Sequence, residues 1–159
     1  MARFRQLCRE HRDRIYTFAC YYMGNREDAE DITQEVLLRL WRHRAPSDAE
    51  GAAAWLTRVA RNACLDALRR RHSYRAVVSG QDPEPVLQNT RAGDEKIELR
   101  LRLEAALTRL DSPYREIIIL REIQGLPYSD ISRSLELPLN TVKVYLHRGR
   151  RRLRALLQE

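Results

Sequence analysis

The last part of the chain holds a basic segment of a kind that binds nucleic acid. Residues 139–154 carry six lysine and arginine side chains and no acidic one. Such cations neutralise phosphates, and arginine also forms paired hydrogen bonds with base edges. The candidates that a helix over 141–157 would direct towards DNA are Thr141, Lys143, His147, Arg148, Arg151 and Arg152. The pattern predicts a DNA-reading helix, and the alternative is an amphipathic helix with a solvated basic face.

The residues before this segment are typical of the first half of a helix-turn-helix. Pro127 is placed to open a short helix that ends at Leu135, and residues 136–140 form the turn. Asn140 or Thr141 is expected to cap the second helix. Apolar positions on both helices would pack together: Ile131, Leu135, Leu137, Val142, Leu146 and Leu153.

Acidic residues crowd the start of an earlier helix, predicted over residues 26–43. Carboxylates are favoured in a first helical turn, which accounts for Glu27 and Asp28. Three later polar residues share one face at i, i+3 and i+4: Asp31, Gln34 and Glu35. An acidic face on a chain of net charge +7 predicts a protein partner with basic residues.

A third group lies on a helix predicted over residues 52–71. Its apolar side would face the core, and the other side carries Arg58, Arg61, Asn62, Asp66 and Arg69. Arginine and asparagine there are suited to contact a DNA backbone or unpaired bases. A solvated helix face is the other interpretation, and the pattern alone does not decide between them.

The charge distribution predicts two basic domains. Residues 1–72 carry 14 basic and 10 acidic side chains, and residues 96–159 carry 13 basic and eight acidic ones. Residues 73–95 between them are acidic, contain two prolines and two glycines, and show no sustained periodicity, which predicts a flexible linker. All but two of the 29 cations are arginines, a bias that nucleic-acid binding or a GC-rich genome would explain.

Helical periodicity predicts an all-α chain. The first helix, over residues 3–23, is expected to divide near Asp13 and to end at Gly24-Asn25. Further helices are expected over residues 96–110 and, buried, over residues 114–123. The positions expected in the core include Leu7, Ile15, Phe18, Tyr22, Ala29, Ile32, Val36, Leu40, Leu56, Val59, Ala60, Ala63, Leu68, Leu99, Leu103, Ala106 and Leu110.

Catalytic and metal sites are not expected. The four histidines are scattered without metal-ligand spacing, and no nucleophile motif or phosphate-binding loop is present. Three cysteines without a C-x-x-C pair suggest neither a disulfide framework nor zinc. No apolar run approaches the ~20 residues of a membrane span, and the charged N-terminus lacks a signal-peptide core. We therefore expect a cytoplasmic protein that is not an enzyme and has no cofactor.

Three segments resemble a known family. The run DAEDITQEVLLRLWRH (Asp28–His43) resembles region 2 of bacterial RNA polymerase sigma factors, and AWLTRVARNACLDALRRR (Ala54–Arg71) resembles the segment that follows it. Residues Ser112–Leu153 resemble region 4. Their order and spacing are similar to the ECF (extracytoplasmic function) subclass, because the 23-residue linker leaves no room for the middle domain of larger sigma factors and nothing precedes region 2.

The resemblance implies a role for each surface. Asp31, Gln34 and Glu35 match the family's contact with the clamp helices of core RNA polymerase. The loop His43–Ala53 and the helix from Trp55 match the surface that opens the −10 promoter element. Lys143, His147 and Arg148 match positions that read the −35 element. The linker would pass through the polymerase towards the RNA exit path, and the resemblance implies regulation by an anti-sigma factor.

The sequence departs from the family's pattern at three positions. Ala52 stands where an aromatic residue is frequent, and Tyr145 stands where an arginine is common. Glu136 occupies the position of the turn glycine, so the turn is expected to adopt an ordinary backbone conformation. The competing hypothesis is a plain DNA-binding regulator with a helical sensor domain, which would leave residues 28–41 and 54–71 without a role.

Overall fold

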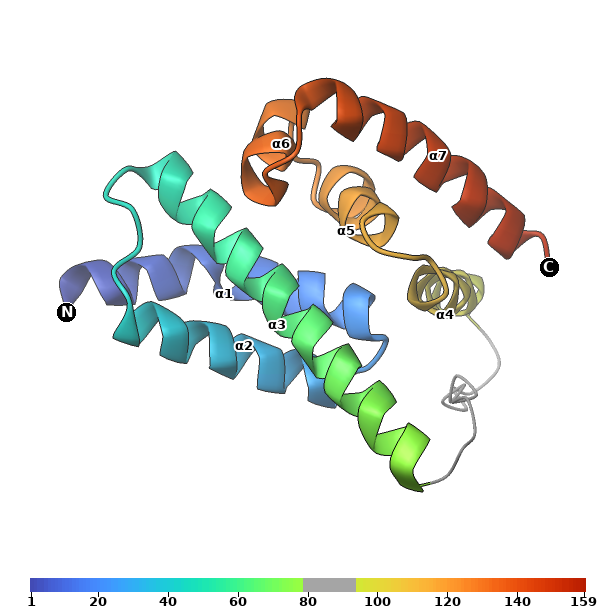
Figure 1. Ribbon diagram of the computed structural model, residues 1–159, viewed down its shortest axis with the longest axis horizontal. Helices are drawn as coiled ribbons and strands as arrows, with labels where there is room; N and C mark the ends of the chain where they lie inside the picture. The colour runs from blue at the N-terminus through green and yellow to red at the C-terminus, as the bar shows by residue number, and fades with distance from the viewer. Residues whose placement is uncertain (79–93) are drawn as a thin grey trace.

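The computed structural model describes residues 1–78 and 94–159, and these residues form helices with no β-strand among them. In the N-terminal half, α1 (Ala2–Met23), α2 (Arg26–Arg42) and α3 (Ala49–Val78) pack into a three-helix bundle. Helix α3 runs diagonally across the other two, as Figure 1 shows. The predicted all-α fold class is confirmed.

The C-terminal half stacks shorter helices under a long one. Helix α4 (Glu95–Thr108) is followed by α5 (Tyr114–Ile118), which continues without a break into a π-helical turn, η1 (Ile119–Ile123). Helix α6 (Tyr128–Leu135) and helix α7 (Leu139–Leu157) then form the helix-turn-helix, and α7 packs on α5 and α4. The buried segment predicted over residues 114–123 is therefore helical throughout.

The break between α1 and α2 follows the predicted turn residues. Gly24 adopts a left-handed conformation with φ 80°, which a glycine accepts without steric cost, and its N–H donates to the carbonyl of Cys20. The Asn25 side chain then accepts from the N–H of Asp28 and caps α2. The predicted division of the first helix near Asp13 is wrong, because α1 continues unbroken to Met23 and packs one face on α2 and α3.

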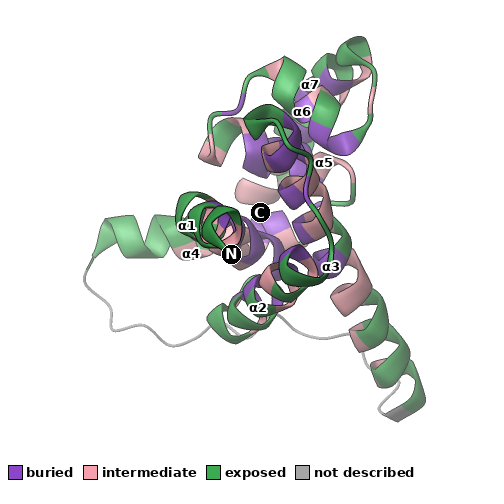
Figure 2. Ribbon diagram, turned by 90° about the vertical axis from the view of Figure 1, so that its left-hand side faces the viewer, coloured by how far each residue is buried: buried purple, intermediate pink, exposed green. Residues whose placement is uncertain are grey.

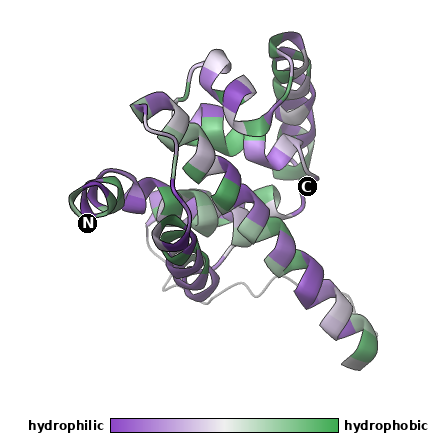
Figure 3. Cartoon of the chain, turned by 60° about the vertical axis from the view of Figure 1, so that its left-hand side comes forward, coloured by the Kyte–Doolittle hydropathy of each residue, from purple (hydrophilic) through white to green (hydrophobic). Residues whose placement is uncertain are grey.

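One hydrophobic cluster runs through both halves of the chain. The predicted stripe of α2 (Ala29, Ile32, Val36 and Leu40) is buried, and so is the run from Ile117 to Leu120. Figure 2 shows the buried residues gathered where the helices face one another, and Figure 3 shows hydrophobic residues on the same inner faces. The two halves thus share a continuous core rather than forming two separate ones.

Direct contacts between the halves explain this continuity. Helix α3 packs against α6, and α1 packs against α4 and η1. A Cβ atom at Gly24 would lie 2.7 Å from Cγ2 of Thr108, so the end of α1 approaches the end of α4 too closely for any other residue without a shift. The halves therefore meet at specific, tightly packed points.

Two further expectations need correction, one about the end of α3 and one about the burial of Leu99. Helix α3 extends to Val78 and so includes the first six residues of the predicted linker; the prolines and glycines that suggested the linker lie outside the described residues. Leu99 was expected in the core but is 62 % exposed. The first turns of α4 are exposed, and only the later part of the helix, where Ala106 and Leu107 are buried, packs into the core.

Candidate nucleic-acid and polymerase interfaces

Helix α7 exposes the predicted basic face to solvent. Lys143, His147, Arg148 and Arg151 are exposed, and none of their side chains forms a hydrogen bond or ion pair within the described part of the chain. On the opposite side, Val142, Leu146 and Gly149 are buried against the rest of the C-terminal half. The arrangement leaves a row of unpaired cations on a rigid helix, which is what contact with nucleic-acid phosphates and base edges requires.

The other two residues predicted for this face are placed differently. Arg152 is exposed, but its guanidinium lies over the ring of Tyr114 at 4.3 Å and 3.9 Å from the carboxylate of Asp111. Thr141 is half-buried in the first turn of α7. Tyr114 and Asp111 therefore orient the Arg152 side chain, whereas the side chains of Lys143 and Arg148 have no such contact among the described residues.

The start of α7 differs from the prediction. The helix begins at Leu139 after Pro138, whose side chain forms no capping hydrogen bond, so Asn140 and Thr141 lie inside the first turn. The expected caps are wrong because proline fixes its own φ and directs the chain into the helix two residues earlier than the polar residues would.

The turn before α7 also differs. Glu136 has φ 55° and ψ 43°, which is the left-handed conformation usually occupied by glycine, so the expected ordinary backbone is wrong. Its N–H and that of Leu137 both donate to the carbonyl of Ser132, which satisfies the end of α6. The hydrogen bonds of the helix-turn-helix thus impose this conformation even though the residue has a side chain.

The residues of α3 that were predicted to contact the −10 element fall into two sets, one bonded to the C-terminal half and one facing solvent. Arg58 is directed at α6: Nε donates to the carbonyl of Ser134 at 3.2 Å and Nη2 to that of Arg133 at 2.9 Å. Arg61 donates from Nε to Oε2 of Glu116 at 3.2 Å. Both arginines are therefore occupied by groups of the C-terminal half.

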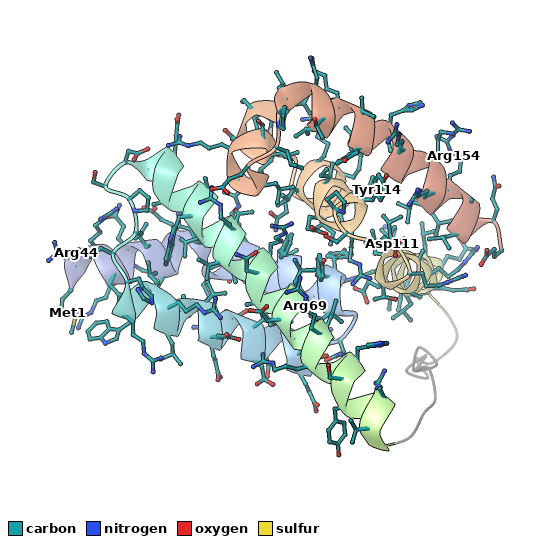
Figure 4. All side chains as sticks on the ribbon, in the orientation of Figure 1. Met1, Arg44, Arg69, Asp111, Tyr114 and Arg154 are labelled. Atoms are coloured by element: carbon teal, nitrogen blue, oxygen red, sulfur yellow. The ribbon has the colours of Figure 1, made fainter. Side chains whose placement is uncertain are left out.

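The remaining members of the group face solvent. Asn62 and Arg69 are exposed, and the carboxylate of Asp66 lies 3.8 Å from the guanidinium of Arg69. Figure 4 labels Arg69 on α3, well away from α6 and α7. The predicted face exists, but only its C-terminal part is open in this arrangement.

The acidic face of α2 is exposed as expected. Asp31 and Gln34 are exposed, whereas Glu35 is half-buried and forms ion pairs with Arg39 at 2.7 Å and with Arg70 at 4.0 Å. Sequence patterns had missed the apolar continuation of this face, where Leu38 and Trp41 are more than half exposed. Their spacing from Gln34, at i+4 and i+7, would have revealed them.

Glu116 on α5 is the centre of a buried polar cluster between the halves. Its carboxylate is fully buried and accepts hydrogen bonds from Tyr22 at 3.0 Å, Ser112 at 2.6 Å and Arg61 at 3.2 Å. Burial, with the negative charge of Glu116, raises the pKa of Tyr22 well above its usual value, so the hydroxyl remains a donor. Hydrogen bonds from three donors offset the free energy lost when the Glu116 carboxylate is removed from water, a cost that an unpaired buried carboxylate would carry in full.

Arg115 beside it joins α5 to the ends of α1 and α4. It donates to the main-chain carbonyls of Tyr22, Thr108 and Leu110 and lies over the Tyr22 ring at 4.7 Å. Burial lowers the pKa of Arg115 from its usual value. Neither residue was a predicted site, because a buried charge cannot be recognised in a sequence until its partners are known.

The described residues hold no group of three or more histidine, cysteine or carboxylate side chains that is arranged to bind a metal. Among the described helices, none is long and apolar enough to cross a membrane. The cysteines of these segments are all free, and burial raises the pKa of the Cys64 thiol.

Comparison with known proteins matches both halves to one family. Residues 7–74 match Sigma-70 region 2, and residues 100–153 match Sigma-70 region 4. The chain is 36 % identical to the ECF RNA polymerase sigma factor SigE of Mycolicibacterium smegmatis over 96 % of its own length, but this covers only 60 % of that protein. It is 34 % identical to SigL of Mycobacterium tuberculosis, with 99 % of this chain and 90 % of SigL covered.

Solved structures of similar fold include two complexes. The sigma factor RpoE bound to the anti-sigma factor NepR from Bartonella quintana superposes with a TM-score of 0.77 at 24 % identity, covering 99 % of this chain and 98 % of that one. CnrH bound to the cytosolic domain of CnrY gives 0.67 at 25 % identity, covering 98 % of this chain and 87 % of CnrH. The two region matches and the 34 % identity to SigL show that the chain belongs to the ECF family of RNA polymerase sigma factors.

Proposed function

We propose that this sigma factor binds core RNA polymerase and directs it to promoters by contacting the −35 and −10 elements. The observation that carries the proposal is the exposed basic face of α7, whose cations Lys143, Arg148 and Arg151 are unpaired among the described residues while the opposite side of the helix is buried. Lys143, His147 and Arg148 would read base edges in a major groove, and Arg151 would contact a phosphate. Thr141 and Arg152 complete this surface at its two ends.

The N-terminal half would supply the other two contacts. Asp31, Gln34 and Glu35 on α2 would meet basic residues of core polymerase, with Leu38 and Trp41 adding apolar contact area beside them. The face of α3 would contact the opened −10 element through Arg58, Arg61, Asn62, Asp66 and Arg69. Opening the duplex costs a few kcal/mol per unstacked base, which holoenzyme formation would help to offset.

We further propose three functional segments. Residues 1–72 form the region 2 domain, residues 73–95 the linker, and residues 96–159 the region 4 domain. The two family matches, separated by residues 75–99, support this division. Helix α3 continues to Val78, so the first six residues of this proposed linker are helical.

Regulation by an anti-sigma factor is part of the proposal. RpoE of Bartonella quintana was solved in complex with the anti-sigma factor NepR, and CnrH in complex with the cytosolic domain of CnrY. This chain has the fold of RpoE and CnrH. A partner that holds the two halves together would cover contacts needed for the promoter. The proposed place of action is the cytoplasm, where polymerase and DNA meet.

In vitro transcription tests the proposal. Purified core polymerase with this chain should make transcripts from genomic DNA that core enzyme alone does not make, and sequencing their 5′ ends would reveal both promoter elements. Anisotropy titrations on one mapped promoter should show weak binding by the free chain and tight binding with core enzyme, because polymerase fixes the spacing of the two halves. Tight, sequence-specific binding by the free chain would favour a plain regulator instead.

A further inference from the structure

The basic face of α7 has an apolar residue at its centre. Val144 is 46 % exposed, although Val142, two residues before it, is fully buried. Two residues correspond to about 200° of helical rotation, so Val144 points away from the core and into solvent. Its neighbours on that face, at i−4, i+3 and i+4, are also exposed: Asn140, His147 and Arg148. An apolar side chain is therefore surrounded by polar ones that are free to contact DNA.

The place of Val144 in the helix gives this exposure a meaning. A single exposed valine is ordinary on a protein surface, and exposure alone does not indicate a contact. Val144, however, lies in the second turn of α7, which begins at Leu139. The second helix of a helix-turn-helix contacts base edges with its N-terminal residues. Valine also favours a helix less than alanine, leucine or lysine does, so helix stability does not explain its presence there.

Asn140 lies one turn before Val144 and has an unpaired amide. The helix begins after Pro138, so Asn140 is inside the first turn rather than at the cap. Its side chain is exposed and forms no hydrogen bond within the described part of the chain. An asparagine amide offers one acceptor oxygen and a donor nitrogen. This pattern complements the N6 donor and the N7 acceptor on the major-groove edge of adenine.

The chemistry of both side chains matches A·T base pairs. In the major groove thymine alone presents a methyl group, against which an apolar side chain packs, whereas Lys143 and Arg148 suit the two acceptors of guanine. One helical turn rises about 5.4 Å, and DNA rises about 3.4 Å per base pair. The contacts of Asn140 and Val144 would therefore fall within two base pairs of each other.

We propose that Asn140 and Val144 make α7 specific for A·T base pairs within the −35 element. The Asn140 amide pairs with one adenine, and the methyl groups of Val144 pack on the methyl group of a thymine within two base pairs of it. The inference rests on the proposed function, since it names bases that the reading helix recognises. The cations of the same face supply attraction to phosphates, and these two uncharged residues add discrimination between bases.

DNA fragments that differ by one methyl group test the thymine contact. In each fragment, deoxyuridine replaces one thymine of the −35 element mapped by transcription, and anisotropy measures binding of the holoenzyme. Wild type should bind about three- to fivefold more weakly at one position, the factor for uncovering one methyl-sized group. Val144→Ala should bind the unmodified fragment more weakly by a similar factor and lose nothing further at that position. Alanine favours the helix, so α7 should remain folded.

The base 7-deazaadenine, which lacks the N7 acceptor, tests the adenine contact in the same way. Wild type should bind about two- to tenfold more weakly when it replaces one particular adenine, the range for one hydrogen bond. Asn140→Ala should be insensitive to the replacement at that adenine. Neither variant should change the dependence of binding on salt, because neither residue is expected to contact a phosphate.

Val77→Ala is the matched control. It makes the same substitution at an exposed valine of α3, outside the helix-turn-helix, and should keep the wild-type penalty at every thymine. Equal penalties in wild type and Val144→Ala at every thymine would overturn the proposal. A 7-deazaadenine penalty that persists in Asn140→Ala would overturn it too, and so would a −35 element without A·T pairs.

These outcomes are distinguishable from failure of the proposed function. If Lys143→Ala still weakens promoter binding by the holoenzyme while the base replacements act equally on all variants, the sigma-factor function stands and the A·T assignment is wrong. If core polymerase with this chain makes no promoter-dependent transcripts, the proposed function fails and the base assignment fails with it.

Discussion

The hydroxyl of Tyr22 on α1 donates a 3.0 Å hydrogen bond to Oε1 of Glu116 on α5, although 94 residues separate them in the chain. Because the acceptor is a fully buried carboxylate, Tyr22→Phe should reduce the free energy of unfolding by about 1.5–3 kcal/mol. Urea denaturation would measure the change. Tyr21→Phe is the control, since the ring of the half-buried Tyr21 contacts Arg100 by its face and a phenyl ring preserves that contact. An equal loss in both variants would contradict the role of the Glu116 bond.

Two cations of α7 are expected to read the −35 element. Lys143→Ala and Arg148→Ala should each weaken binding of holoenzyme to its promoter by about 1–3 kcal/mol, with little change on scrambled DNA. Arg150→Ala serves as the control in the same titration, because Arg150 is paired with Glu122 rather than free on the reading face. A loss that is the same for specific and scrambled DNA would argue against base reading.

Arg151 is one helical turn further along the same face and is expected to contact a phosphate. Arg151→Ala should weaken binding to all sequences alike and reduce the slope of log K against log salt by about 0.9. Titrations over a range of salt concentrations would measure this slope. An unchanged slope would remove Arg151 from the phosphate contacts.

Asp31 tests the polymerase surface. The residue is exposed and unpaired within the described chain, so Asp31→Lys should reduce affinity for core polymerase by about tenfold or more through like-charge repulsion without unfolding α2. Glu30→Lys makes the same charge change on the neighbouring side of the helix and should have a smaller effect. Adding Glu35→Lys should weaken binding further, although it also places a cation beside Arg39 and Arg70. Core affinity that is insensitive to Asp31→Lys would contradict the assignment of this face.

His11 predicts a pH dependence of stability. Burial, reinforced by the positive charge of Arg14, lowers the pKa of His11 below its ordinary value of 6.5, while Glu10 opposes the shift. The unfolded chain therefore binds this proton at a higher pH than the folded chain does. The His11 contribution is fully present above pH 6.5 and is lost as the pH falls through the lower pKa of the folded state.

His11→Gln should consequently reduce the loss of stability between about pH 7.5 and about pH 5.5. Thermal unfolding midpoints at the two pH values would measure the difference. His147→Gln changes an exposed histidine on α7 and should leave the pH dependence as in wild type. A wild-type pH profile in His11→Gln would show that other groups dominate.

The positions of most helices could be predicted because each depends on local patterns. The period of Ala29, Ile32, Val36 and Leu40 placed the core face of α2, and Gly24 with Asn25 marked its start. The same reasoning failed at Leu99, which has the right period but lies on the exposed first turns of α4, which the other described helices leave uncovered. Periodicity shows which face is apolar but not whether a neighbour reaches it.

The sites show the same limit. The exposed cations of α7 were predictable because their unpaired run is visible in the sequence. The left-handed Glu136 was not, because the rule that assigns such positions to glycine ignores the hydrogen bonds to Ser132 that impose the conformation. The occupation of Arg58 and Arg61 by region 4 was also beyond prediction, since it joins residues more than 50 positions apart.

Side chains that cross between the halves often end on the main chain of the other half. Among the described residues, three donors have this geometry: Arg58 to Arg133 and Ser134, Arg115 to Tyr22, and Gln124 to Arg14. A carbonyl oxygen persists whichever side chain its residue carries, so mutations at these acceptor positions preserve the bond. Natural selection then constrains only the donor of each pair, and homologues need no compensating substitution across the boundary. Residue coevolution is therefore expected to be faint for these three contacts and stronger where two side chains meet across the boundary, as Arg61 and Glu116 do.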